Sequence, residues 1–242
     1  MKLLTPFLQR VVTGHYAGRI VDFLRDLKQE RIEAHGADTS TARFFDEIND
    51  NERFDVPERL AVGPSFFTSD EMLRYNDRAD WSQVDLYMQI FAARFIEAAR
   101  KHKIPLYVHT ALRSPQEQDR LKAAGRSQLT SRNAPHCKGA AVDIVHARYH
   151  WQLTPHEWLL LGKIGKKVAS SITVRDPANG NKAVGPLALD WGGDWKPKGS
   201  KELIGWDPAH WQLSNWQSKL VAVPAVPVRL TPRAILARYR GL

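Results

Sequence analysis

The sequence has little cysteine, no long hydrophobic run and no signal-peptide core. Cys137 is the single cysteine among 242 residues, which excludes an intramolecular disulfide and a structural zinc site built from several cysteines. No apolar run approaches the roughly 18–20 residues that cross a bilayer. Polar residues and a proline interrupt the first ten positions, so we expect synthesis in the cytoplasm without a signal peptide.

Acidic residues are also in deficit. The chain has 35 Lys and Arg against 26 Asp and Glu, a formal net charge of +9. Five of the basic residues and no acidic residue lie in the last 24 positions, so we expect a basic C-terminal tail over residues 217–242. This charge favours polyanionic partners, which include nucleic acid, anionic lipid and an anionic cell wall, and does not choose among them.

The pattern of apolar and capping residues predicts an α+β protein. Residues 1–70 have the features of a helical N-terminal extension, and residues 71–216 form the candidate catalytic domain. Within that domain we expect helices over residues 81–102, 114–125 and 154–169, and strands over 104–110, 140–145 and 171–175. Separated helices and short strands favour a small antiparallel sheet flanked by helices over a doubly wound sheet.

Two imidazoles and two carboxylates form the most informative group of residues. His136 lies before the predicted strand that contains Asp143, and Gly139 allows a close turn between them. Two histidines and one carboxylate can hold a catalytic zinc ion with one open position. Asp207 and His210 are three residues apart, so one could move a proton while the other binds the metal. From the spacing alone, the third ligand could come from elsewhere.

Four separated motifs resemble those of the D-alanyl-D-alanine carboxypeptidase-like (VanY-type) zinc peptidases. Residues 136–143 match the HxxGxAxD pattern, 112–118 resemble the YRSxxxQ segment, 191–195 read WGGDW, and 207–210 match DxxH. The resemblance covers roughly residues 80–216. The family includes phage endolysins that cleave L-alanyl-D-glutamate bonds. Residues 191–195 resemble the corresponding segment of these endopeptidases.

The resemblance implies an activity and a role for each matching residue. His136, Asp143 and His210 would bind one Zn²⁺ per chain, Asp207 would be the general base, and Arg113 would stabilise the oxyanion. The reaction implied is hydrolysis of peptidoglycan stem peptides by zinc-activated water. The substrate contacts implied are Gln118, Trp191 and Asp194.

The sequence departs from the family pattern at two places. Ala134 stands where Ser or Thr is frequent, and residues 111–112 are Ala-Leu where the family usually has Gly-Tyr. Both changes leave the proposed ligands intact. Cys137 is beside a proposed ligand, but we expect its side chain to point away from the metal if this segment is extended.

Other functions use the same residues. A D,D-carboxypeptidase or D,D-endopeptidase would have the same ligands and base, and a catalytically inactive zinc-containing wall-binding module would have the same architecture. Nucleic-acid binding would rest on charge alone.

An endolysin would act on the wall after release by a holin-type partner, or would be carried in a phage particle.

Ordinary structural roles are the competing interpretation of the same residues. Asp207 could cap the turn at Pro208, Arg113 could pair with a surface carboxylate, and Gln118 could be a solvated helix residue. The dense tryptophans from 191 to 216 could line a glycan groove, but core packing is the expected use for most of them.

Overall fold

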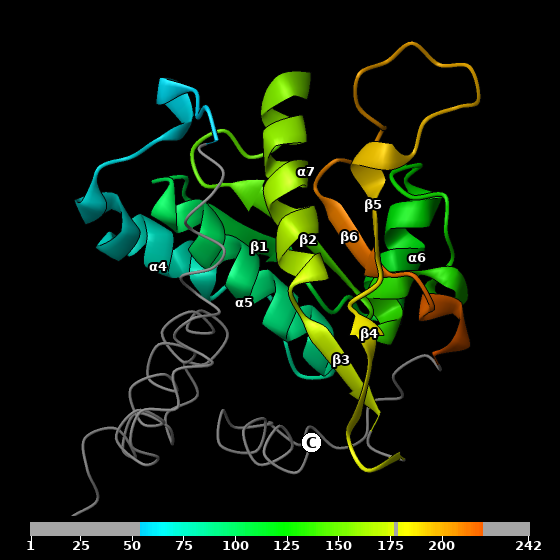
Figure 1. Ribbon diagram of the computed structural model, residues 1–242. Helices are drawn as coiled ribbons and strands as arrows, with labels where there is room; N and C mark the ends of the chain where they lie inside the picture. The colour runs from blue at the N-terminus through cyan, green and yellow to red at the C-terminus, as the bar shows by residue number, and fades with distance from the viewer. Residues whose placement is uncertain (1–53, 177–178, 220–242) are drawn as a thin grey trace, which may run out of the picture.

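The computed structural model describes residues 54–176 and 179–219, and the predictions for residues 1–53 and 220–242 lie outside these ranges. Four strands form one antiparallel sheet in the order β1-β2-β6-β5. Their bounds are Leu106–Thr110 (β1), Ala141–His146 (β2), His210–Leu213 (β6) and Leu189–Trp191 (β5). A separate hairpin pairs β3 (Thr173–Asp176) with β4 (Lys182–Pro186). The predicted α+β class with a small antiparallel sheet is confirmed (Figure 1).

Within the described residues, four α-helices accompany the sheet, and α5 and α7 pack against each other over it (Figure 1). The helices are α4 (Asp70–Asn76), α5 (Leu86–Lys101), α6 (Pro115–Ala123) and α7 (Pro155–Ser170). Short 3₁₀ turns connect them, including η2 (Glu58–Leu60), η5 (Pro135–Lys138) and η7 (Gly192–Asp194).

Capping residues explain where the helices begin. At α7, Thr154 Oγ1 accepts a bond from Glu157 N, and Thr154 N donates to the Glu157 carboxylate, which completes a capping box. The predicted start of α5 at Trp81 was five residues early. Asp85 Oδ1 accepts a bond from Tyr87 N at 2.9 Å, so the helix begins only after this cap.

The core between the sheet and the helices contains tightly packed aromatic rings. Phe91 and Phe95 of α5 contact Trp211 of β6, with ring centroids 5.0 and 5.6 Å apart. A Cβ at Gly165 of α7 would lie 2.5 Å from the Trp211 ring, and one at Gly162 would lie 2.2 Å from the Trp191 ring. Glycine at both positions therefore lets two tryptophans lie directly against the helix.

Residues 54–62 contact the same core. Leu60 is fully buried, and its carbonyl oxygen is 3.0 Å from Nε2 of the buried His146. Arg59 forms a bidentate ion pair with Glu157 of α7, both contacts being 2.5 Å. These contacts join the segment before α4 to the first turn of α7. The predicted domain boundaries at residues 70 and 217 remain predictions.

Candidate metal centre

His136 lies on the short turn η5, which is shaped by a glycine. Gly139 ends η5 with a φ of +60°, and a Cβ there would be 2.0 Å from the carbonyl oxygen of Gln83. Only glycine combines this backbone conformation with so close a contact. The next residues enter β2, so the turn brings His136 beside the strand that contains Asp143.

Asp143 and His210 are direct partners across two strands. They are opposite each other in the antiparallel pairing of β2 with β6. Side chains of opposed residues share one face of a sheet, so this register brings the carboxylate and the imidazole together. Residues far apart in the sequence thereby become neighbours.

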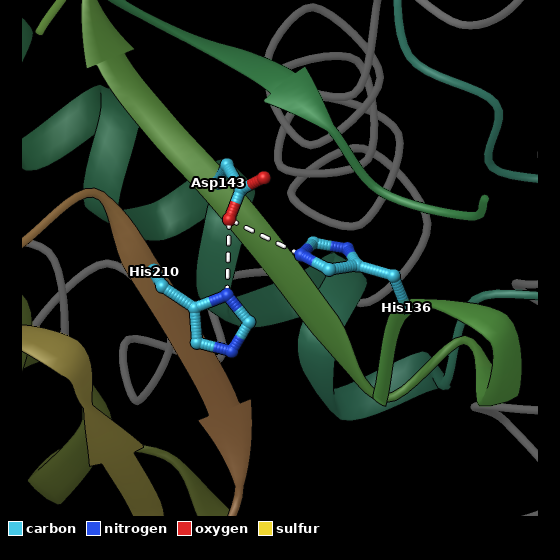
Figure 2. A group of neighbouring side chains, drawn as sticks. All are labelled: His136, Asp143 and His210. Carbon is cyan, nitrogen blue, oxygen red and sulfur yellow. Dashed lines mark hydrogen bonds and ion pairs between the residues drawn. The ribbon is translucent and has the colours of Figure 1, made fainter. Parts of the chain in front are cut away.

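One oxygen of Asp143 faces both imidazoles (Figure 2). Asp143 Oδ1 is 3.1 Å from His136 Nε2 and 3.0 Å from His210 Nδ1. The candidate ligand atoms of the three residues lie within 4.8 Å of one another, and both histidines are buried. The structure therefore brings together the three residues that the sequence analysis assigned to the metal.

The hydrogen bonds of the nitrogens that point away from Asp143 show which nitrogen of each imidazole has a lone pair facing Asp143. His136 Nδ1 is 2.8 Å from the carbonyl oxygen of Ala111, which can only accept, so Nδ1 carries the proton. His210 Nε2 is 3.1 Å from the Oε1 atom of Gln212, to which it donates. In neutral imidazoles, two nitrogen lone pairs would then face a carboxylate oxygen. This arrangement requires a cation, supplied either by protons or by a metal ion.

The directions of the pKa shifts of Asp143 and His210 agree with a site that attracts positive charge. Burial raises the pKa of Asp143, but the charges and hydrogen bonds of His136 and His210 outweigh burial and hold it well below its usual range. Burial lowers the pKa of His210, yet the bond to Asp143 and its charge raise it overall. The cluster thus favours an anionic carboxylate next to positive charge.

The donor set fits a divalent transition metal. Two imidazole nitrogens and one carboxylate oxygen are ligands that Zn²⁺ accepts in a site with an open fourth position. Each imidazole also donates its other N–H to a neutral oxygen, which orients the ring in many metal sites. These three residues can therefore hold a metal ion.

Cys137 is not part of this cluster. Residues 136–137 lie in the 3₁₀ turn η5 and not in an extended segment, so the expectation based on extended backbone does not apply. Burial raises the pKa of the Cys137 thiol, which favours the protonated form that binds metal poorly. Among the described residues, the cluster with metal-ligand geometry consists of His136, Asp143 and His210.

Asp207 is positioned by a very close backbone contact. A Cβ at Gly192 would be 2.1 Å from the carbonyl oxygen of Asp207, so the 207 segment lies directly on the turn η7. Trp191 Nε1 donates to the Pro208 carbonyl at 2.8 Å and supports the same segment. Burial raises the pKa of Asp207, and the nearby charge of Asp143 raises it further. The carboxyl group is thus suited to holding a proton beside the metal cluster.

Arg113 faces Asp143 and is held by a buried glutamine. Its Nη2 is 3.7 Å from Asp143 Oδ2, while its Nη1 donates to Gln118 Oε1 at 2.8 Å. Gln118 is only 1% exposed, and its Nε2 donates to Ser127 Oγ and Leu129 O. All bonding positions of this amide are directed at the protein, so Gln118 orients the guanidinium.

The other two residues predicted to contact substrate, Trp191 and Asp194, have partners other than the three ligands. Trp191 is 4% exposed and packs on Trp211 and α7. Asp194 pairs with Lys166 of α7 at 2.7 Å. The structure does not bring them to the three ligands, and their contact with substrate remains a prediction.

Residues that contact the metal ligand His210 were not predicted from the sequence. Trp195 lies against His210, with ring centroids 5.2 Å apart, and Trp206 beside it is 70% exposed. Gln212 bonds His210 directly. A strand assigned to residues 210–213 would have revealed it, because residues two apart on a strand share a face.

Comparison with solved structures gives distant similarities. No family model and no curated protein matches the chain. Among solved structures, it is similar to the crystal structure of the Serratia marcescens L-Ala D-Glu endopeptidase ChiX. The identity is 22%, the alignment covers 56% of this chain and 90% of that chain, and the TM-score is 0.35. In the part of the chain that the structure describes, no helix is long and apolar enough to cross a membrane.

Proposed function

We propose that the protein is a zinc-dependent peptidase of peptidoglycan, with L-alanyl-D-glutamate endopeptidase activity. One observation carries the proposal: one ligand atom from each of His136, Asp143 and His210 lies within 4.8 Å of the others. Arg113 Nη2 is 3.7 Å from Asp143 Oδ2, and His210 N donates to the carbonyl oxygen of Asp207 at 3.1 Å. The four motifs that resemble VanY-type peptidases support the choice of substrate, because they place the same residue types in the same order.

His136 Nε2, Asp143 Oδ1 and His210 Nδ1 would hold the metal ion. A bound Zn²⁺ supplies Lewis acidity, which polarises a carbonyl and makes water more acidic. Asp207 would accept the proton of the attacking water and transfer it to the leaving amine. Burial raises the pKa of Asp207 in the metal-free protein, which favours a carboxyl group that can take up a proton.

Arg113 would stabilise the negative charge that develops on the carbonyl oxygen. Its forked donors can bind an oxyanion, and the bond to Gln118 fixes their direction before substrate arrives. Such preorganisation avoids reorienting a long side chain during the reaction.

The partners follow from the substrate. We propose peptidoglycan as the macromolecular partner, with a holin-type protein releasing the enzyme to the wall or a phage particle carrying it. The net charge of +9 is compatible with an anionic envelope. No specific nucleic-acid contact is proposed.

Mass spectrometry of digested peptidoglycan tests the proposal. We expect the zinc-loaded protein to create new amino termini on D-glutamate, and Asp207→Ala to bind zinc without creating them. Released D-alanine would indicate a D,D-carboxypeptidase, and a cut between cross-linked stems would indicate a D,D-endopeptidase. Identical muropeptide profiles with and without the protein would contradict the enzyme and favour a wall-binding module.

A further inference from the structure

A chain of hydrogen bonds extends from His210 to the edge strand of the sheet. His210 Nε2 is 3.1 Å from Gln212 Oε1, Gln212 Nε2 is 3.2 Å from Asp190 Oδ2, and Ser214 Oγ is 2.7 Å from Asp190 Oδ1. Asp190 and Gln212 are direct partners in the pairing of β5 with β6. The chain thus joins the metal cluster to β5.

The carboxylate of Asp190 determines the orientation of the Gln212 amide. A glutamine can present either its oxygen or its NH₂ group to a neighbour. An ionised carboxylate only accepts hydrogen bonds, so the NH₂ group must face Asp190 and the oxygen must face His210. Because Gln212 is only 8% exposed, water offers few alternative partners.

The orientation of Gln212 in turn selects the protonated nitrogen of His210. An amide oxygen facing Nε2 requires a proton there, which leaves the Nδ1 lone pair directed at Asp143. The reversed amide would place its oxygen against Asp190 and favour the tautomer with a proton on Nδ1, where it would block metal binding. At His136 the backbone carbonyl of Ala111 accepts the hydrogen bond that Gln212 accepts at His210. The tautomer of His136 therefore does not depend on the orientation of a side chain.

We infer that Gln212 and Asp190 are positioning residues that hold His210 in its metal-binding tautomer. This inference rests on the proposed function, because it assigns these side chains to the same metal site. It adds two residues that touch neither the metal nor the reacting atoms. Ser214 fixes the second oxygen of Asp190 and completes the chain.

Zinc affinity, measured by competition with a chromophoric chelator, tests the inference. We expect Gln212→Leu and Asp190→Leu to raise the Kd for zinc about 10–100-fold, the usual effect of losing such an outer partner. Asp190→Asn should bind zinc more tightly than Asp190→Leu, because its carbonyl oxygen can still accept from Gln212. Gln89→Leu is the matched control, since Gln89 is a buried glutamine whose Nε2 donates to the carbonyl oxygen of Val84, just before α5.

A spectroscopic signature separates this role from a loss of folding. In the zinc-loaded unaltered protein, ¹H–¹⁵N NMR should detect an exchange-protected Nε2–H proton on His210, and Gln212→Leu should lose that protection. Equal zinc affinity in Gln212→Leu and the unaltered protein would overturn the inference about Gln212 and Asp190. It would not contradict the metal site itself. Failure of the unaltered protein to bind zinc would instead overturn the proposed function.

Discussion

Substituting Gly192 by alanine tests whether the turn η7 positions Asp207. The Cβ added by Gly192→Ala would be 2.1 Å from the Asp207 carbonyl oxygen, and real Cβ contacts are essentially never under 3.0 Å. The backbone around Asp207 must therefore move by about 0.9 Å, the difference between these distances. A displacement of about 1 Å can lower turnover about 10²-fold.

The assay for Gly192→Ala is the initial rate of peptidoglycan hydrolysis by zinc-loaded protein. We expect kcat to fall about 10²-fold, whereas zinc stoichiometry stays at one per chain because Asp207 is not a proposed ligand. Gly63→Ala is the control, since Gly63 has an ordinary φ of −66° and open space around its Cβ position. A Gly192→Ala variant with the turnover of the unaltered protein would show that the contact between Gly192 and the Asp207 carbonyl does not position Asp207.

Two further predictions concern charged side chains. Arg113→Lys should lose the forked donors and the bond to Gln118, so we expect kcat to fall about 10²–10³-fold. The zinc stoichiometry should not change. Full activity in Arg113→Lys would exclude a role for Arg113 at the oxyanion. Glu157→Gln should lower the free energy of unfolding by about 1.5 kcal/mol at neutral pH, near the lower end for a charged hydrogen bond because Arg59 is 42% exposed. The bonds of Arg59, partly offset by burial, lower the pKa of Glu157 from 4.5 to about 2. The stabilisation is therefore present above about pH 4.5 and lost as the pH falls toward about 2. The free energies of unfolding of the two proteins, measured in urea, should become equal in acid. A difference that does not change with pH would contradict the role of the ion pair.

The sequence predicted the elements that have local signals. Ser114 before Pro115 marked the start of α6, and its Oγ accepts the bond from Glu117 N. Thr154 marked α7 in the same way. Alternating apolar residues located β1, and a short apolar run located β2, both within two residues. Caps and periodicity depend on neighbours in the chain, which is why a single sequence reveals them.

Features that depend on pairing between distant segments were missed. β6 has only four residues and follows a turn, so its strand character arises from pairing with β2 and β5. Without that strand, the bond from His210 to Gln212 cannot be anticipated. Likewise, the alternative that Gln118 is a solvated helix residue was wrong, because its burial depends on the loop of Ser127 and Leu129.

X-ray absorption spectroscopy of the zinc-loaded protein can show whether His136, Asp143 and His210 form the metal site. We expect one zinc per chain with two imidazole nitrogens at about 2.0–2.1 Å and a carboxylate oxygen, and loss of this signal in Asp143→Ala. A sulfur ligand at about 2.3 Å, which would implicate Cys137, or an unchanged spectrum in Asp143→Ala would contradict it.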